Sequence, residues 1–323
     1  MGGFVPVIHG RAADRPDEAD TLTNAREIAH ALERIGYVSD IIEVDLDLTA
    51  LEKLAARRPK AVFNLVESIR GDGALGHLAG AALDHFGVPY TGAGTVAYIQ
   101  SASKLMTKHV LQSAGLLAPH YWIDRAPPKE VGKVIVKSVD EHASYGMDQK
   151  SVVDAADALA EIANRERIFG GRFFCEEYIP GREFNISVLD GEKGPRVLPM
   201  AEMTFDKLPP GVLPIVDYEA KWHEESPSYQ LSERRFGVEE AEPALAARLK
   251  RMTLDCWRAA GLAGYARIDF RVDETGKPFI LEYNANPCLA PDAGFAAALG
   301  RAGLSYEDGV RAIVDAALNR AAR

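Results

Sequence analysis

The sequence predicts an α/β chain with a parallel sheet at its N-terminus, a small mixed lobe in the middle and a C-terminal lobe. Short apolar strands alternate with helical patterns over the first 95 residues, which is typical of βαβ units. Two alternating segments on either side of residues 273–277 predict an antiparallel hairpin. A length of 323 residues with 47% hydrophobic residues allows two or three compact lobes.

The first part of the chain follows from apolar runs and helix signals. A strand is expected from Phe4 to Ile8, then a loop to Asp20, and then a helix from Thr21 to Ile35 that Gly36 ends. Further strands are expected at 38–44 and 61–65, and helices at 48–56, 75–86 and 104–114. Such sheets bind ligands at the carboxyl ends of their strands.

The rest of the chain is expected to form two further lobes. Strands are predicted at 133–138, 173–179 and 182–189, and Ser151 with Asp154 forms a capping box for a helix to about Arg167. A long amphipathic helix is expected at 238–260, and Ser305 with Asp308 is expected to cap a last helix. We predict domains at 1–95, 96–180 and 181–323.

Composition excludes several classes of protein. The net charge of −10 argues against a nucleic-acid partner, which usually requires a basic face. The three cysteines are widely spaced, so neither a disulfide framework nor a zinc cluster is indicated, and a reducing cytoplasm fits best. Residues 1–6 show no basic n-region followed by a long apolar core, so no secretory signal is expected, and no apolar run approaches the roughly 20 residues that a membrane helix needs.

The hairpin strands carry a candidate metal and nucleotide site. Side chains alternate along a strand, so Arg267 and Asp269 share one face, and Glu282 and Asn284 share one. Carboxylate and amide oxygens suit Mg²⁺, and the guanidinium suits a phosphate. Solvated strand ends are the alternative interpretation, because acidic residues near turns are common.

Three segments upstream add lysines and carboxylates. Lys104 and Lys108 lie on a predicted helix and Lys137 ends a strand, positions at which solvent-facing charges are the commoner interpretation. Glu176 and Glu177 interrupt an otherwise apolar strand, whose backbone can pair with an adenine edge.

Together these segments resemble the ATP-grasp superfamily, and within it the D-alanine–D-alanine ligases. The resemblance covers nearly the whole chain and rests on six motifs in the same order. The motifs are Ser103-Lys104-Leu105-Met106-Thr107-Lys108, Val134-Ile135-Val136-Lys137, Glu176 to Phe184, Asp217 to Trp222, Ala266-Arg267-Ile268-Asp269 and Leu281-Glu282-Tyr283-Asn284. An ATP-grasp fold is therefore expected.

The resemblance implies a role for each matching residue. Lys104 and Lys137 contact the α- and β-phosphates of ATP, Ser144 and Gly146 belong to a small-residue loop over the phosphates, and Lys221 reaches the γ-phosphate. Arg267 faces the transferring phosphoryl group. The adenine slot is formed by Glu176, Glu177, Tyr178 and Ile179, Glu183 takes the ribose, and Asp269, Glu282 and Asn284 hold two Mg²⁺ ions, for which Mn²⁺ can substitute.

The implied reaction joins a small carboxylate to an amine, both expected to be amino acids, through an acyl phosphate. A homodimer formed through the N-terminal lobe is a further expectation from the resemblance. In the ligases a glycine and a serine after the asparagine-proline turn hold the second alanine, but here Cys288 and Ala293 follow Asn286. Asp17 or Glu18 is the candidate for the first ammonium group, so the candidate substrate residues are Asp17, Glu18, Asn286 and Cys288.

Two other functions stay open. One is true D-alanine–D-alanine ligase activity, which Cys288 and Ala293 disfavour. The other is a nucleotide-binding regulator without catalysis, which the retained Arg267, Lys221 and metal ligands disfavour. For Cys288, the alternative to a nucleophile is a packing residue. For His142, the alternative to an acid, base or phosphate contact is a surface histidine without a role.

Overall fold

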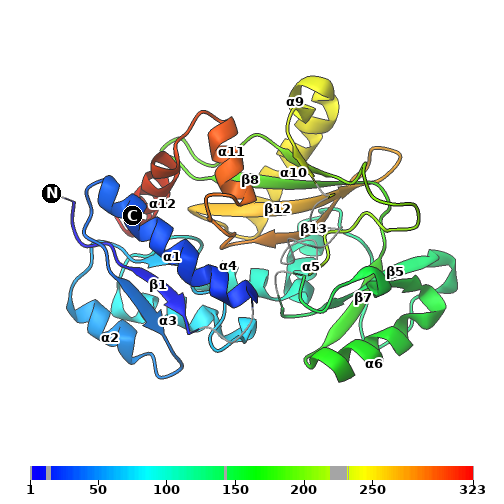
Figure 1. Cartoon of the computed structure of the whole chain (residues 1–323), viewed down its shortest axis with the longest axis horizontal. Coiled ribbons are helices and arrows are strands. Elements are labelled where there is room, and N and C mark those ends of the chain that lie inside the picture. Colours follow the sequence, from blue (N-terminus) through cyan, green and yellow to red (C-terminus); the bar gives the residue numbers. More distant parts are fainter. Residues whose placement is uncertain (1, 12–15, 142–143, 219–230, 232, 323) are drawn as a thin grey trace.

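A computed structural model describes residues 2–11, 16–141, 144–218, 231 and 233–322. Figure 1 shows three groups of elements: the N-terminal sheet and its helices at the lower left, the segment with β5, β7 and α6 at the lower right, and the strands β8, β12 and β13 above and between them. The predicted α/β fold class is confirmed. Within the described residues, no helix is both long and apolar enough to cross a bilayer.

The N-terminal sheet is parallel, with β1 (Val7–Gly10) between β2 (Ile41–Val44) and β3 (Phe63–Asn64). The helices of this part are α1 (Pro16–Arg34), α2 (Thr49–Ala56) and α3 (His77–Phe86). Two further helices, α4 (Thr95–Ala102) and α5 (Lys104–Ser113), follow and contact the C-terminal hairpin. The prediction of a loop up to Asp20 is wrong, because α1 begins at Pro16. Proline favours the first helical position and acidic residues in the first turn suit the helix dipole, so the helix starts earlier than the apolar pattern indicates.

A second sheet has the order β4 (Tyr121–Trp122), β7 (Phe173–Glu177), β5 (Lys133–Ser138) and β6 (Val152–Asp154), and α6 (Ala158–Phe169) packs on it. The predicted helix start at Ser151 is wrong. Asp148 and Ser151 form a capping box on a short 3₁₀ turn, and the chain then pairs with β5 as β6. The β-branched Val152 and Val153 favour this strand over a helix.

The third sheet has the order β11 (Glu233–Arg235), β10 (Ala201–Thr204), β8 (Arg182–Leu189), β12 (Tyr265–Val272) and β13 (Pro278–Asn284), and β9 (Arg196–Val197) also pairs with β8. The single helix expected at 238–260 is two helices, α9 (Val238–Ala241) and α10 (Pro243–Ala259). Pro243 cannot donate to the preceding turn, so a new helix starts there.

The predicted hairpin is confirmed, with Arg267 opposite Asn284 and Asp269 opposite Glu282. The chain ends with α11 (Gly294–Arg301) and α12 (Tyr306–Ala321), and the expected box of Ser305 with Asp308 caps α12. Because α12 packs against α1, the first and last parts of the chain share a hydrophobic core. The domain boundaries near residues 95 and 180 stay predictions.

The loop after β3 is held tightly against its neighbours. A β-carbon at Gly10 would lie 1.7 Å from the Ser68 carbonyl oxygen, so β1 and this loop meet backbone to backbone. The Tyr98 hydroxyl donates to the carbonyls of Val66, at 2.8 Å, and Glu67, at 3.1 Å. Glu67 therefore lies in a loop that β1 contacts at Ser68 and that Tyr98 holds through two carbonyls.

Candidate active site

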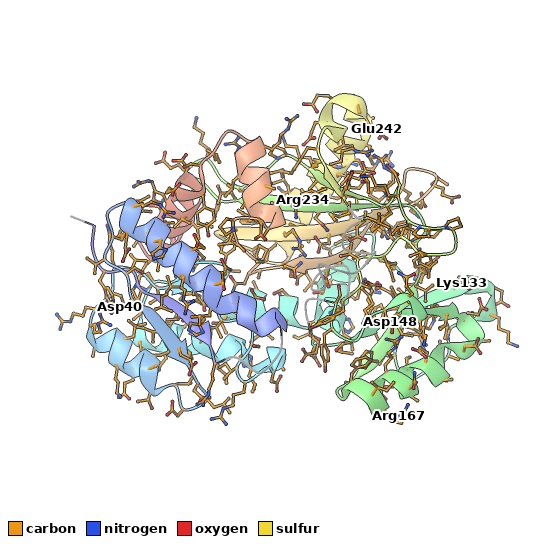
Figure 2. All side chains as sticks on the ribbon, viewed as in Figure 1. Asp40, Lys133, Asp148, Arg167, Arg234 and Glu242 are labelled. Atoms are coloured by element: carbon orange, nitrogen blue, oxygen red, sulfur yellow. The ribbon has the colours of Figure 1, made fainter. Side chains whose placement is uncertain are left out.

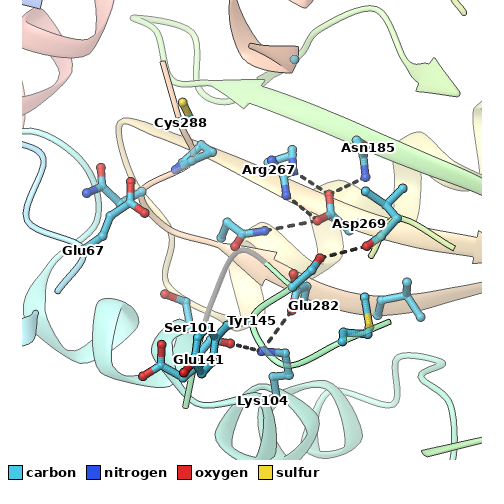
Figure 3. Close-up of a pocket in the computed structure, with 18 of the residues that line it drawn as sticks. Glu67, Ser101, Lys104, Glu141, Tyr145, Asn185, Arg267, Asp269, Glu282 and Cys288 are labelled. Atoms are coloured by element: carbon cyan, nitrogen blue, oxygen red, sulfur yellow. Dashed lines mark hydrogen bonds and ion pairs between the residues drawn. The ribbon is translucent and has the colours of Figure 1, made fainter. Parts of the chain in front are cut away.

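One cavity of about 750 Å³ collects most of the residues that the sequence singled out. Its walls come from all three groups of elements, and Figure 3 shows part of them. The predicted site residues that line it are Lys104, Lys137, Ser144, Glu176, Glu177, Tyr178, Ile179, Glu183, Arg267, Asp269, Glu282, Asn284, Asn286 and Cys288.

The register of the third sheet explains why so many polar side chains share one face. Asp269 of β12 lies between Asn185 of β8 and Glu282 of β13, and Arg267 lies between Ser187 and Asn284. Residues directly opposite one another on neighbouring strands point to the same side of a sheet. The strands therefore carry these groups into the cavity as a flat, polar floor.

Arg267 and Asp269 form the centre of this floor. The Arg267 Nε and Nη2 atoms each lie 2.7 Å from a different carboxylate oxygen of Asp269, so the pair is bidentate (Figure 3). The side-chain amides of Asn185 and Asn284 also donate to Asp269, at 3.0 and 3.3 Å. Burial alone would lower the pKa of Arg267, but the neighbouring Asp269 carboxylate outweighs it and raises the pKa.

Glu282 faces a lysine across the cavity. The Lys104 Nζ atom lies 3.9 Å from Glu282 Oε2 and donates to the Glu141 carbonyl at 2.5 Å. Burial lowers the pKa of Lys104, and Glu282 opposes this shift. Like charges directly opposite on neighbouring strands repel, so the Asp269 and Glu282 carboxylates favour a cation beside them. Two carboxylates and the Asn284 amide are a donor set that fits Mg²⁺.

A buried cluster of two lysines and one glutamate lies next to the floor. Glu176, only 1% exposed, pairs with Lys108 Nζ at 2.6 Å and with Lys137 Nζ at 2.7 Å. Lys108, also 1% exposed, donates to the Leu281 carbonyl of β13 at 3.0 Å. Burial alone would raise the pKa of Glu176, but the two ammonium groups outweigh it and hold the pKa below its ordinary value. The cluster joins α5, β5, β7 and β13.

A buried arginine of β12 contacts the turn between β7 and β8 and the segment at Pro214. Arg271 donates to the carbonyls of Gly181 at 3.0 Å and Pro214 at 2.6 Å, and its guanidinium lies 3.9 Å from a Glu183 carboxylate oxygen. Its Cζ atom lies 5.9 Å from the centre of the Tyr178 ring. Arg271 thus fixes two cavity-lining side chains relative to each other.

The small-residue loop divides between the cavity and the protein interior. Ser144 has a positive φ of 64°, lines the cavity and donates to the Val216 carbonyl at 2.9 Å. The Gly146 carbonyl accepts from Arg165 at 3.0 Å, and a β-carbon at Gly146 would lie 3.0 Å from the Phe173 ring. Gly146 therefore allows close packing beneath the loop.

The other end of the cavity is formed by the asparagine-proline turn and the loop after β3. In Figure 3, Glu67 and Cys288 lie on the side of the pocket away from Asn185. The Cys288 Sγ atom accepts from the Ala290 N–H at 3.5 Å, and the Asn286 amide oxygen accepts from the Tyr265 hydroxyl. Ala293, where a serine was expected from the resemblance, adds no hydroxyl to this wall.

Comparison with known proteins decides the family. The family model described as the D-ala D-ala ligase C-terminus matches residues 129–315, more than half of the chain. The chain belongs to the D-alanine–D-alanine ligase family. A D-alanine–D-alanine ligase of Acidiphilium cryptum is 31% identical over 277 residues, covering 84% of each chain. An uncharacterized protein of Sinorhizobium fredii, y4sG, is 29% identical over 306 residues, covering 92% of this chain and 88% of its own.

Solved structures confirm the fold of this family member. The chain superposes on a Bacillus anthracis D-alanine–D-alanine ligase complexed with ATP with a TM-score of 0.77, at 18% identity, covering 100% and 99% of the two chains. The predicted ATP-grasp fold is thus confirmed, as is the prediction of an ATP-dependent ligase that forms C–N bonds.

Some predicted residues of this ligase family member cannot be placed. Lys221 and His142 lie outside the described residues, and although α1 includes Asp17 and Glu18, their side chains are not described. Sequence reasoning gave no site role to several cavity or cluster residues: Glu67, Lys108, Asn185, Arg234 and Arg271. One signal was available, because Lys108 follows Lys104 by one helical turn on α5 and lies on the same face.

Proposed function

We propose that this chain uses ATP to join a small carboxylate to an amine through an acyl phosphate, releasing ADP and phosphate. The observation that carries the proposal is the shared cavity floor, where Arg267, Asp269 and Glu282 lie beside Lys104 and Lys137. Phosphoryl transfer depends on positioning and on neutralising charge, and cationic side chains next to metal ligands suit both needs.

Each side chain has a distinct task in this proposal. Lys104 and Lys137 bind phosphate oxygens of ATP, and Ser144 and Gly146 belong to the loop over them. The strand Glu176, Glu177, Tyr178 and Ile179 receives the adenine, and Glu183 receives the ribose. Arg267 stabilises the transferring phosphoryl group, which requires its guanidinium to loosen its bidentate grip on Asp269. Lys221 is assigned the γ-phosphate from the family resemblance alone.

Asp269, Glu282 and Asn284 are the proposed ligands of two Mg²⁺ ions, for which Mn²⁺ can substitute. Metal ions at this place neutralise charge that develops on the phosphoryl oxygens. The chain's own part is to hold the two carboxylates opposite each other on β12 and β13, with Arg267 and Lys104 offsetting their repulsion.

Substrates are proposed to be amino acids or similar small molecules. Asn286 and Cys288 line the proposed substrate end, and Asp17 or Glu18 is the candidate for an ammonium group. Glu67 adds a carboxylate from the loop after β3, where Tyr98 donates to its backbone carbonyl. Location in the cytoplasm, the lack of a nucleic-acid partner and a homodimer stay predictions.

True D-alanine–D-alanine ligase activity is the second candidate, because relatives over most of the chain carry that name. The altered wall at Cys288 and Ala293 disfavours it.

The test offers pairs of amino acids of both chiralities, one as the acid and one as the amine, together with ATP and Mg²⁺. ADP release is expected to depend on which pair is offered. Coupled ADP detection measures it, and mass spectrometry identifies the amide. Dipeptide from D-alanine alone would establish the second candidate. Tight ATP binding with no ADP from any pair would contradict the proposal and favour the non-catalytic regulator.

A further inference from the structure

One wall of the cavity is held by side chains rather than by a strand ladder. Residues 205–217 form neither helix nor strand, and Ile215 and Val216 within them line the cavity. Backbone N–H and C=O groups that water does not reach nearly always have hydrogen-bond partners. In the strap, defined as residues 213–217, several of these partners are side chains, and they come from two of the three groups of elements.

Gln149 makes the contacts on the side of the second sheet. Its Oε1 atom accepts from the Leu213 N–H at 2.8 Å, and its Nε2 atom donates to the Leu213 carbonyl and to Asp217 Oδ2, both at 3.3 Å. One side-chain amide thus pairs with both backbone groups of Leu213, as a neighbouring strand would, and with a carboxylate of a residue only 2% exposed. Gln149 therefore holds the strap at its first and last residues.

Gln149 itself is firmly placed. It begins a short 3₁₀ turn (Gln149–Ser151) that Asp148 and Ser151 close with a capping box. The Asp148 carboxylate also accepts from Arg165 of α6 at 2.6 Å, and Arg165 is buried. In Figure 2, Asp148 lies in the group of elements at the lower right. The turn is therefore fixed to the part of the chain that contains β5, β7 and α6.

The third sheet holds the strap from the other side. Arg271 of β12 donates to the Pro214 carbonyl at 2.6 Å, and the same guanidinium lies beside Tyr178 and Glu183. Tyr178 and Glu183 are the proposed contacts of the adenine and the ribose. The strap therefore lies at the nucleotide end of the cavity, where two of its side chains complete the wall.

The small-residue loop expected over the phosphates is tied to the same segment. Ser144 donates to the Val216 carbonyl at 2.9 Å, and the Tyr218 N–H donates to the Met147 carbonyl at 3.1 Å. The rings of Tyr145 and Tyr218 pack edge to face, with their centres 6.3 Å apart. A displaced strap would therefore disturb both the wall at the adenine and the loop at the phosphates.

We propose that Gln149 is a positioning residue for the nucleotide, which docks the strap between the second and third sheets and so completes the wall against which ATP binds. The inference rests on the proposed place of ATP in this cavity. A ligand binds more weakly in proportion when the binding-competent state is only partly populated. Without the Gln149 amide the docked strap loses three hydrogen bonds, so a smaller fraction of the protein is ready to bind ATP.

Two substitutions separate the hydrogen bonds of Gln149 from its packing. Gln149→Met keeps the length of the side chain and removes all three hydrogen bonds. Gln149→Glu keeps the shape and the acceptor for the Leu213 N–H, but at about pH 8, where a glutamate is ionised, it turns a negative charge toward the Asp217 carboxylate. The same two substitutions at Gln112, which is exposed on α5, are the matched controls.

The probe is ADP with Mg²⁺, titrated into the full chain by calorimetry, because its binding needs no turnover. Gln149→Met and Gln149→Glu are each expected to raise the Kd for ADP by about tenfold or more, whereas both Gln112 variants keep the wild-type Kd. In the ligase assay, KM for ATP is expected to rise and KM for the acid and the amine to stay unchanged. Melting temperatures without nucleotide are expected to agree among the four variants, because the strap opens locally.

The outcomes separate this inference from the proposed function. Wild-type affinity for ADP in Gln149→Glu would overturn the inference, because that variant keeps the shape and changes only the hydrogen bonds. Weak binding of ADP with a melting temperature far below that of the Gln112 variants would also overturn it, since the fold rather than the strap would have failed. Absence of ADP release from every substrate pair would overturn the ligase proposal and leave the ADP titration decisive for Gln149. A wild type that does not bind ADP would overturn both.

Discussion

Replacing Glu282 by glutamine is expected to lower kcat at least about a hundredfold while leaving the fold intact. The change removes a negative charge from the donor set that Asp269, Glu282 and Asn284 offer, and the loss of one such electrostatic group typically costs a factor of 10² to 10³. The Glu282 side chain is 26% exposed and its ion pair with Lys104 is long, at 3.9 Å, so folding depends little on it. Steady-state ADP release and a melting curve measure the two effects.

Glu274→Gln is the control for this change. Glu274 is exposed in the turn of the same hairpin, at its other end, and the substitution is chemically identical. Glu274→Gln is expected to keep wild-type turnover. Near-normal kcat in Glu282→Gln would mean that the metal ligands are misassigned.

Replacing Lys108 by methionine is expected to lower the free energy of unfolding by about 3–5 kcal/mol. Lys108 and Glu176 are each 1% exposed, so the change removes a nearby partner of a carboxylate that water barely reaches. Lys137 remains 2.7 Å from Glu176, and the Leu281 carbonyl loses its donor. Equilibrium denaturation of Lys108→Met measures the effect, with Lys133→Met as the control.

The control breaks an ion pair on the surface. Lys133 and Asp154 are 3.0 Å apart with side chains 55% and 67% exposed, and such pairs contribute about 0–1 kcal/mol. The double variant Lys108→Met/Glu176→Gln is expected to recover part of the loss, because it also removes the buried carboxylate that Lys108→Met leaves with Lys137 alone as its partner. Equal destabilisation by Lys108→Met and Lys133→Met would contradict the role of the cluster.

The same cluster predicts how acid affects Lys108→Met. A carboxyl whose pKa is lower in the folded state stabilises the fold above its unfolded pKa of about 4.3, and this contribution is lost as pH falls through the folded pKa. Lys108 helps to hold the pKa of Glu176 low. Acid unfolding of Lys108→Met is therefore expected at a higher pH than in the wild type.

The grouping of polar side chains on β12 and β13 could be predicted from sequence because its geometry is local. Alternation along two strands and one turn sufficed to bring Arg267, Asp269, Glu282 and Asn284 together, and the observed register agrees. The break at Pro243 could also have been predicted, because proline cannot continue a helix.

Residues that depend on distant partners could not be predicted. Lys108 looked like a surface charge, and its burial follows from Glu176, which is 68 positions away and on another element. Arg234 lies in a strand of three charged residues whose own pattern favours no strand. That strand forms by pairing with β10, about 30 residues earlier, so no local signal placed Arg234 in the cavity.

Transfer of oxygen from the acid substrate to phosphate tests the central claim most directly. The acid is labelled with ¹⁸O in its carboxylate and converted with ATP and the amine that gives the most ADP release. An acyl phosphate intermediate predicts that each turnover leaves one labelled oxygen in the released phosphate, detected by ³¹P NMR or mass spectrometry. Unlabelled phosphate, with the label confined to acid and amide, would contradict the account.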